Sequence, residues 1–244
     1  MIKAYIINLK SATHRKEEME RQIAQIDGIE FCFFDAISYE DERFLHYRKY
    51  WDWDFFTKLY RGKALTLGEK ACFSSHYALW EKCVRMQEKI LVLEDDVVFS
   101  QDFAKQIQHL FEDEELNFLR LMPYFEKRSF EFKKGIRQTF DSICGTQGYI
   151  LSPIAASLFL QKAKIWFCPV DNYIDKPFLH NVPNLFVVPS LITENQDMQS
   201  CIDADKMGES RKAKIPIYYK ISKEFLNLLE KIWRYIYVCQ NNAR

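Results

Sequence analysis

The stretch KILVLEDDVVFS (residues 89–100) decides the fold, because a run of apolar residues ends there in adjacent carboxylates. Residues 90–94 have the length and composition of a buried strand. Three acidic residues, Glu94, Asp95 and Asp96, stand at its end, and Val97 and Val98 come directly after them. The stretch therefore predicts a buried strand whose carboxyl end carries a cluster of negative charge.

Strand-length apolar runs alternate with segments of helical period on both sides of this stretch. We expect strands at 4–9, 30–34, 90–94, 118–122, 148–152 and 185–189, and helices at 11–26, 65–87, 103–111 and 154–164. Thr66 and Glu69 form an S/T-x-x-E capping box at the start of the second helix. This alternation predicts an α/β fold with a mainly parallel central sheet.

The composition limits the class of protein. The chain has 244 residues, of which 48% are hydrophobic, enough for one domain or one domain with an appendage. Its 34 Lys and Arg residues equal its 34 Asp and Glu residues, so bulk charge does not indicate a nucleic-acid partner. The 7 cysteines show no C-x-x-C pair and no zinc spacing, which favours reduced thiols. With neither a signal peptide nor a membrane-spanning run in view, we expect a cytoplasmic protein.

Two segments break the alternation and divide the chain into an expected main domain, residues 1–205, and a helical segment, residues 206–244. Residues 40–63 form an aromatic and charged insert without a clean period. Its aromatic residues either form a sugar-stacking surface on a mobile loop or pack beneath that loop as a small hydrophobic cluster; they are Tyr50, Trp51, Trp53, Phe55, Phe56 and Tyr60.

The segment 206–244 is basic and ends in an amphipathic run. It carries 9 Lys and Arg residues against 3 acidic ones. A helix over residues 220–238 with this pattern is suited to peripheral contact with an anionic membrane face. The alternatives are packing on its own domain or on a second subunit, as in a homodimer.

The three carboxylates suggest a metal site. Ligands of open α/β sheets bind beyond the carboxyl ends of the strands, and neighbouring carboxylates raise each other's pKa unless a cation lies between them. Oxygen ligands suit Mg²⁺ or Mn²⁺, which commonly hold a diphosphate as well. The other interpretation is a solvated turn, and the tripeptide alone leaves both open.

Other segments add candidate ligand contacts. The helix that opens at Gly68 offers unpaired N–H groups to an anion, with Lys70 in its first turn. His76 lies on an apolar stripe of the same helix, which favours a core role. Arg15, one turn before Met19, either faces the cleft or lies on the surface.

Two later segments carry further candidates. CGTQGYILS (144–152) places Thr146, Gln147 and Gly148 at the start of a strand, where they border a ligand or form a plain turn. PVDNYID (169–175) carries Asp171 and Asp175, which share a face if the stretch is helical. Asp171 after Pro-Val also suits an ordinary helix cap.

Together these segments resemble glycosyltransferase family 25, the bacterial lipooligosaccharide galactosyltransferases. The matching pieces are INL with Arg15 downstream, LGEKACFSSHYALW (67–80), LEDDV (93–97), GTQGYILSPIAA (145–156) and PVD (169–171). They cover about the first 175 residues. The segment 192–206 is short and has no histidine, so a late metal ligand of the family is not expected there.

The resemblance implies a GT-A-like fold, a UDP-sugar donor and an inverting transfer of a hexose, with β-galactosyl transfer expected. Glu94 and Asp96 are then the ligands of Mn²⁺ or Mg²⁺. Donor-binding residues are Asn8, Leu9, Arg15, Lys70, Ser75, His76, Asp95, Thr146, Gln147 and Gly148.

For the general base we expect Asp171, with Glu69 second and His76 third. The acceptor implied is a lipid-linked oligosaccharide, and the insert 40–63 is expected to contribute to its choice. Two other functions stay open at this point: a metal-dependent nucleotide phosphohydrolase or nucleotidyltransferase, and a non-catalytic nucleotide-sugar-binding protein.

Overall fold

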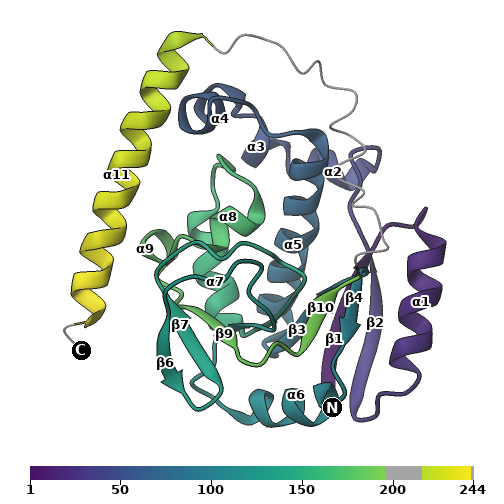
Figure 1. Cartoon of the computed structure of the whole chain (residues 1–244). Coiled ribbons are helices and arrows are strands. Elements are labelled where there is room, and N and C mark those ends of the chain that lie inside the picture. The colour runs from purple at the N-terminus through teal and green to yellow at the C-terminus, as the bar shows by residue number, and fades with distance from the viewer. Residues whose placement is uncertain (196–215, 243–244) are drawn as a thin grey trace.

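A computed structural model of the chain describes residues 1–195 and 216–242. Helices cover both faces of a central sheet (Figure 1). The sheet has eight strands: β1 (Ile2–Asn8), β2 (Ile29–Asp35), β3 (Ile90–Glu94), β5 (Phe118–Arg120), β6 (Phe130–Lys133), β7 (Ile136–Thr139), β8 (Gly148–Leu151) and β9 (Asn184–Val187). A second sheet pairs β4 (Val97–Phe99) with β10 (Ile192–Glu194). The helices are α1 (Thr13–Ile23), α2 (Glu42–His46), α3 (Arg48–Trp51), α4 (Asp54–Arg61), α5 (Leu67–Met86), α6 (Phe103–Glu112), α7 (Pro153–Lys162), α8 (Val170–Ile174), α9 (Pro177–His180) and α11 (Ile217–Asn242).

The order of strands confirms the α/β class and shows a mixed sheet. The order is β2-β1-β3-β8-β5-β9-β7-β6. Parallel pairing joins β2, β1 and β3, and also joins β5 to β9. The pairs β3–β8, β5–β8, β7–β9 and β6–β7 are antiparallel. The expectation of a mainly parallel sheet therefore holds for β2, β1 and β3, whereas the rest of the sheet is mixed, and the GT-A-like assignment stays a prediction.

Strand β3 is apolar from Ile90 to Leu93 because this part is covered on both faces. Ile90 and Val92 pack into one core cluster, and Leu91 and Leu93 into a second on the other face. The first cluster includes residues of α5 and α7, and the second includes Met19 of α1 together with residues of α6. Since successive side chains of a strand point to opposite faces, a strand between two helical layers needs an apolar residue at each position.

The aromatic insert folds into the short helices α2, α3 and α4. Tyr50 and Trp51 pack against the first core cluster, and Tyr50 stacks on Trp166 with ring centroids 5.8 Å apart. Trp53, Phe55 and Phe56 stay exposed. The insert therefore combines the packed cluster with an exposed aromatic edge, and its use by an acceptor stays a prediction.

The C-terminal segment contains one long helix, α11, which lies against α4 and α9 at one edge of the molecule (Figure 1). The predicted domain boundary at 205/206 and most of the segment 192–206 lie outside the described residues. Among the helices of residues 1–195 and 216–242, none combines the length and the apolar character needed to cross a membrane.

Replacing Trp166 tests the first core cluster. Trp166 is fully buried, and its ring stacks on Phe73 with centroids 4.2 Å apart. Trp166→Ala is expected to lower the free energy of unfolding in urea by about 3–5 kcal/mol, because it removes a large buried ring and leaves a cavity. Phe55→Ala, at a ring that is 60% exposed, serves as the control and is expected to cost under ~1 kcal/mol. Equal losses in both variants would contradict this account of the core.

Candidate active site

Three strand ends meet at a cavity of about 450 Å³. Because β2, β1 and β3 are parallel, their carboxyl ends share one edge of the sheet. Helix α1, which follows β1, and helix α5, which precedes β3, contribute to opposite core clusters, so the chain changes sides of the sheet at this edge. Such a switch point is the usual ligand site of open α/β sheets. The cavity is lined by residues that follow each of the three strands and by the start of α5, including Leu9, Arg15, 36–41, Gly68, Ser75, His76 and 94–96.

The acidic tip after β3 is held by an arginine and an asparagine. Arg15 Nη1 lies 2.7 Å from Asp95 Oδ1, and Asn8 Nδ2 donates to Asp95 Oδ2 at 2.7 Å. Arg15 is buried, although it comes from α1, about 80 residues earlier in the sequence. Both oxygens of Asp95 therefore have protein partners, which makes Asp95 an anchor of the tip more than a ligand for a cation.

Asp96 has a different environment. Arg15 Nη1 lies 3.3 Å from Asp96 Oδ2, whereas the buried Oδ1 has no hydrogen-bond partner among the described residues. Burial and the charge of Glu94 raise the pKa of Asp96 to about 7, although Arg15 acts in the opposite direction. Asp96 therefore lines the cavity with one carboxylate oxygen that has no hydrogen-bond partner among the described residues. A buried carboxylate in this state is a candidate ligand for a cation.

Glu94 is tied to the core by a chain of polar side chains. Its Oε1 accepts a hydrogen bond from the hydroxyl of Thr146 and lies 3.6 Å from His76 Nε2. His76 Nδ1 lies 2.8 Å from the hydroxyl of Tyr149, which also accepts from the indole N–H of Trp80 at 3.1 Å. Tyr149 can then donate to Nδ1, which leaves the proton on Nε2 toward Glu94. Burial acts to raise the pKa of Glu94, but the contacts with His76, Thr146 and Arg15 lower it overall.

Helix α5 supplies part of the cavity wall and part of its support. The capping box of Thr66 and Glu69 is present as predicted, and Gly68 in the first turn lines the cavity. Ser75 Oγ accepts the N–H of Ile37 at 2.8 Å and so holds the loop after β2. Ser75 therefore lines the cavity and positions this loop, and its contact with a donor stays a prediction.

Two other residues of this helix turn toward the insert. Lys70 Nζ lies 2.9 Å from Asp54 Oδ1 and above the ring of Trp51. Glu69 accepts from Arg61 at 2.9 Å and from the N–H of Thr66, and although burial acts to raise its pKa, these contacts lower it overall. Neither residue lines the cavity, and a carboxylate held in this way is poorly suited to accept a proton.

The turn before β8 reaches the site because β8 runs antiparallel to β3. Gly148, the first residue of β8, pairs with Leu93, so residues 144–147 lie beside the acidic tip. A Cβ at Gly148 would lie 2.6 Å from Ile192 Cδ1 and 3.0 Å from Leu93 Cδ2. A larger residue at position 148 would therefore make these side chains shift, and the approach of a ligand to Gly148 stays a prediction. Gln147 is buried, and its backbone carbonyl accepts the N–H of Glu94 at 2.8 Å.

Asp171 and Asp175 lie on the same short segment in unlike environments. Asp175 is fully buried and accepts from Arg120, Asn184, Ser142 and the N–H of Cys144. Asp171 Oδ1 accepts from the N–H of Asn172, the next residue in the chain, at 2.8 Å. Burial raises the pKa of Asp171, and the charges of Asp175 and Glu94 add to this effect. Asp171 is not part of the cavity wall, but the influence of Glu94 places it within electrostatic reach of the acidic tip.

Asp96 and Glu94 would suit one divalent cation that takes most of its other ligands from a bound substrate. Within residues 1–195 and 216–242 no group of three His, Cys, Asp or Glu side chains is arranged to hold a metal. Mg²⁺ commonly binds through one or two carboxylates plus phosphate oxygens and water. Asp96 has the free oxygen for this arrangement, and Glu94 is its neighbour. The fit is therefore to a cation that arrives with a phosphate-bearing ligand.

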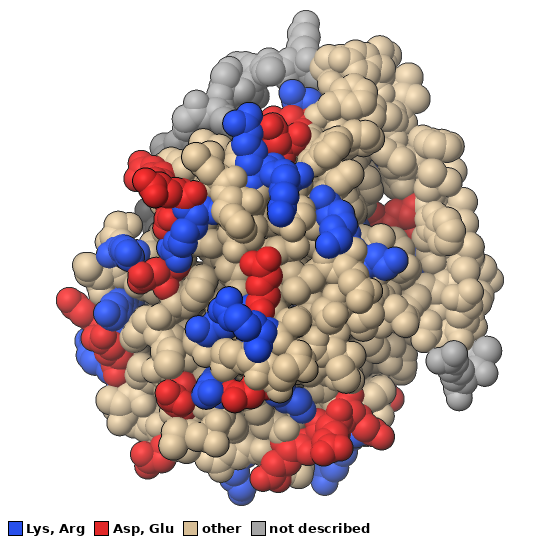
Figure 2. All heavy atoms as spheres, turned by 180° about the vertical axis from the view of Figure 1, so that it is seen from behind, with Lys and Arg blue, Asp and Glu red and all other residues tan. Residues whose placement is uncertain are grey.

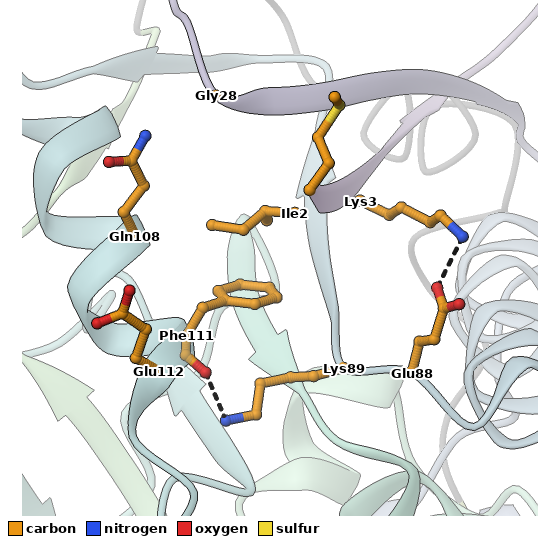
Figure 3. A pocket seen from close by; sticks show the side chains of 9 residues that line it. Ile2, Lys3, Gly28, Glu88, Lys89, Gln108, Phe111 and Glu112 are labelled. Atoms are coloured by element: carbon orange, nitrogen blue, oxygen red, sulfur yellow. Dashed lines mark hydrogen bonds and ion pairs between the residues drawn. The ribbon is translucent and has the colours of Figure 1, made fainter.

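A second cavity, of about 650 Å³, lies at the opposite ends of the strands (Figure 3). Lys3 pairs with Glu88 at 2.7 Å, and Lys89 donates to the carbonyl of Phe111 at 3.2 Å. Both lysines of this cavity are thus engaged by the protein. The carboxylates with unusual pKa values lie at the other edge of the sheet, which is the better candidate for chemistry.

Residues 36–39, in the loop after β2, carry no sequence signal for a site role. They line the cavity together with residues 40 and 41 of the insert and with Lys10, Ser11 and Cys72. The rule that parallel strands end at one edge would have placed the loop there once β2 was known to pair with β1. No motif marks it, because the backbone position and not a special residue type brings it to the site.

Acidic residues beside a switch-point cavity of an α/β sheet mark a candidate ligand site, and similarity to known proteins gives the class of protein. Residues 1–174 match the family model described as "Glycosyltransferase family 25 (LPS biosynthesis protein)". The chain therefore belongs to glycosyltransferase family 25, as the sequence motifs indicated.

Relatives of the chain differ in what their names say of activity. "Lipooligosaccharide biosynthesis protein lic2B" of Haemophilus influenzae is 32% identical over 162 residues, which cover 61% of this chain and 58% of the relative. "Procollagen galactosyltransferase 2" of Mus musculus is 32% identical over 115 residues, 45% of this chain and 18% of that protein. "Inactive glycosyltransferase 25 family member 3" of Homo sapiens is 47% identical over 57 residues, 23% and 10% respectively. The chain thus spans less than two thirds of the length of each.

The stability of the metal-free protein tests the environment of Asp96. In EDTA at pH 8, Asp96→Asn is expected to raise the free energy of unfolding, by at most about 4 kcal/mol since one pKa unit corresponds to about 1.4 kcal/mol. In the native protein the pKa of Asp96 is about 7, whereas the ordinary pKa of an aspartate is 3.8, so the buried carboxyl keeps its proton until the pH approaches 7. Wild-type stability therefore falls as pH rises between these values, and the advantage of the variant should shrink below pH 7.

Asp95→Asn is the matched control at the neighbouring position. It weakens the contacts with Arg15 and Asn8, so urea denaturation should show a loss of stability at pH 8. If Asp96→Asn were destabilising at pH 8 as well, the described environment of Asp96 would be incorrect.

Proposed function

We propose that this chain is an inverting glycosyltransferase that moves a hexose, with galactose expected, from a UDP-sugar to a core sugar of a lipid-linked lipooligosaccharide acceptor. The observation that carries the proposal is the buried Asp96 oxygen at the wall of the switch-point cavity, which has no partner within residues 1–195 and 216–242. Family membership and the names of the lipooligosaccharide and galactosyl relatives support the substrate classes.

Asp96, with Glu94 beside it, would hold Mn²⁺ or Mg²⁺. Such an ion supplies Lewis-acid stabilisation of the departing diphosphate. The protein's part is to keep the tip in place: Arg15 and Asn8 hold Asp95, and Thr146 and His76 hold Glu94. Leu9 and the loop 36–41 would line the uridine side of the cavity, next to the first turn of α5.

Asp171 is the general base that we favour. In an inverting transfer the acceptor oxygen bonds to the anomeric carbon as the bond from that carbon to the diphosphate breaks, and the hydroxyl proton passes to the base. Burial and the nearby carboxylates raise the pKa of Asp171, which improves its ability to take that proton. Glu69 is the weaker candidate because Arg61 and the backbone of Thr66 hold its carboxylate.

Replacing Asp96 tests whether UDP binding depends on a cation held by this residue. Asp96→Ala is expected to abolish the dependence of UDP affinity on Mn²⁺, measured by calorimetry with and without EDTA. Glu40→Ala, an exposed carboxylate of the loop that lines the same cavity, is the control and should keep that dependence. UDP binding by wild-type protein that EDTA leaves unchanged would remove the cation from the proposal.

Removing the charge of Asp171 separates binding from chemistry. Asp171→Asn is expected to keep UDP affinity while the transfer rate falls at least about 100-fold, the usual contribution of a general base. Glu69→Gln is expected to lower stability through the loss of its Arg61 contact, with a smaller effect on transfer. A transfer rate near wild type in Asp171→Asn, in a steady-state assay of UDP release, excludes this role.

The function as a whole is tested by a donor screen that follows UDP release, with a panel of lipooligosaccharide core fragments and with and without Mn²⁺. Release that requires both one donor and one acceptor supports a transferase. Equal release without acceptor indicates a phosphohydrolase. Tight donor binding with no release for any acceptor places the chain with its relatives that are named inactive.

A further inference from the structure

Helix α11 carries an apolar stripe that faces away from the rest of the molecule. The stripe consists of six residues at alternating spacings of three and four: Tyr218, Ile221, Phe225, Leu228, Ile232 and Tyr235. All six are exposed, from 46% at Ile232 to 69% at Tyr235. This spacing, a period of 3.5 residues sustained over most of the helix, is the a/d pattern of a helix that packs along another helix.

The opposite face of α11 is already occupied by the protein's own main domain. Glu230 accepts from Lys176 at 2.8 Å, and Ser222 donates to the carbonyl of Leu59 at 3.0 Å. Arg234 donates to the carbonyl of Asp175 at 3.1 Å. These contacts direct the stripe outward, and Figure 2 shows the rim formed by α11 as a surface with few charged atoms.

The exposed apolar area of the α11 stripe is larger than the apolar patches found on the surfaces of typical monomeric proteins. The six residues of the stripe are between 46% and 69% exposed. Large side chains have roughly 150–250 Å² of surface each, so the stripe exposes on the order of 700 Å². Monomeric proteins rarely leave an apolar patch above ~600 Å², and a standard protein interface buries about 800 Å² per partner.

We propose that the stripe binds the stripe of a second copy of this chain, with the two α11 helices antiparallel about a two-fold axis. A two-fold axis between residues 226 and 227 brings like residues together: Tyr218 meets Tyr235, Ile221 meets Ile232, and Phe225 meets Leu228 of the other copy. Each layer then joins side chains of similar size or kind, and the surface is complementary to itself.

The charges beside the stripe favour this arrangement. Glu224 and Lys231 flank the stripe on the same side, both exposed. In the antiparallel register Glu224 of each copy lies beside Lys231 of the other, as g positions do in antiparallel coiled coils, and two ion pairs form by symmetry. In a parallel pair both would instead lie beside apolar residues, Leu229 and Ile236. At a membrane with anionic lipids Glu224 would face like charge, so the predicted membrane contact of residues 220–238 accounts less well for the pattern.

Charge reversal tests the pairing in the full-length protein. Wild-type protein is expected to be a dimer by sedimentation equilibrium at micromolar concentrations. Glu224→Lys and Lys231→Glu should each weaken the dimer about tenfold or more by placing like charges together, and the double variant should restore it. Lys220→Glu, with the same change of charge as Lys231→Glu but off the interface, is the control and should leave the dimer intact.

Crosslinking tests the register. In a Cys239→Ser background, the pair Ile221→Cys with Ile232→Cys should give a disulfide-linked dimer on mild oxidation, whereas Ile221→Cys alone should not. Crosslinking of Ile221→Cys with itself would indicate parallel helices and overturn the register.

Removing an apolar contact tests the interface itself. Leu228→Asp, at a residue that is 55% exposed, should give a folded monomer. A dimer that survives Leu228→Asp would place the interface elsewhere. A wild-type monomer that floats with phosphatidylglycerol vesicles, and loses flotation in Leu228→Asp, would assign the stripe to a membrane and overturn the proposal.

Discussion

The guanidinium of Arg15 makes the acidic tip of the sheet possible. Three adjacent carboxylates at the end of a buried strand repel one another, and burial removes most of the water that would screen them. Arg15 contacts both Asp95 and Asp96 from a buried position on α1, and Asn8 at the end of β1 completes the shell of Asp95. The shell is nevertheless incomplete, because one oxygen of Asp96 has no partner in the part of the chain that the structure describes. The contact that holds the tip therefore leaves one buried oxygen of a cavity-lining carboxylate without a partner among the described residues.

Much of the N-terminal half could be predicted from the sequence because its elements are long and strongly periodic. The strand of the opening stretch ends at Glu94 as expected, and α5 begins at its capping box. An unusual environment for the acidic residues could also be predicted from the sequence alone, since neighbouring carboxylates at a buried strand end must raise one another's pKa. The structure adds that burial and the charge of Glu94 raise the pKa of Asp96, whereas contacts with His76 and Thr146 lower the pKa of Glu94 overall.

The rest depended on contacts between distant segments. The strands β4 and β10 have three residues each, too few for a period to identify them. Lys70 and Glu69 stand where a ligand contact is plausible from helical position alone, yet their partners Asp54 and Arg61 belong to an insert without a readable pattern. The antiparallel direction of β8, which brings Thr146 to Glu94, follows from the order of strands in the sheet and not from the residues of β8 itself.

Asp171 and Asp175 illustrate how the surroundings assign different roles to the same side chain. Asp175 is saturated: Arg120 bonds to it and also to the carbonyls of Cys144 and Gly145, so the pair fixes the turn that leads to Thr146. Its own carbonyl accepts from Arg234, which attaches α11 to the same place. With its oxygens occupied by these donors, the carboxylate of Asp175 has a structural role. Asp171, one helical turn earlier, has a backbone donor and negative neighbours, and the buried Asp175 is one of the charges that raise its pKa. The structural aspartate therefore both positions the turn beside Glu94 and contributes to the raised pKa of Asp171.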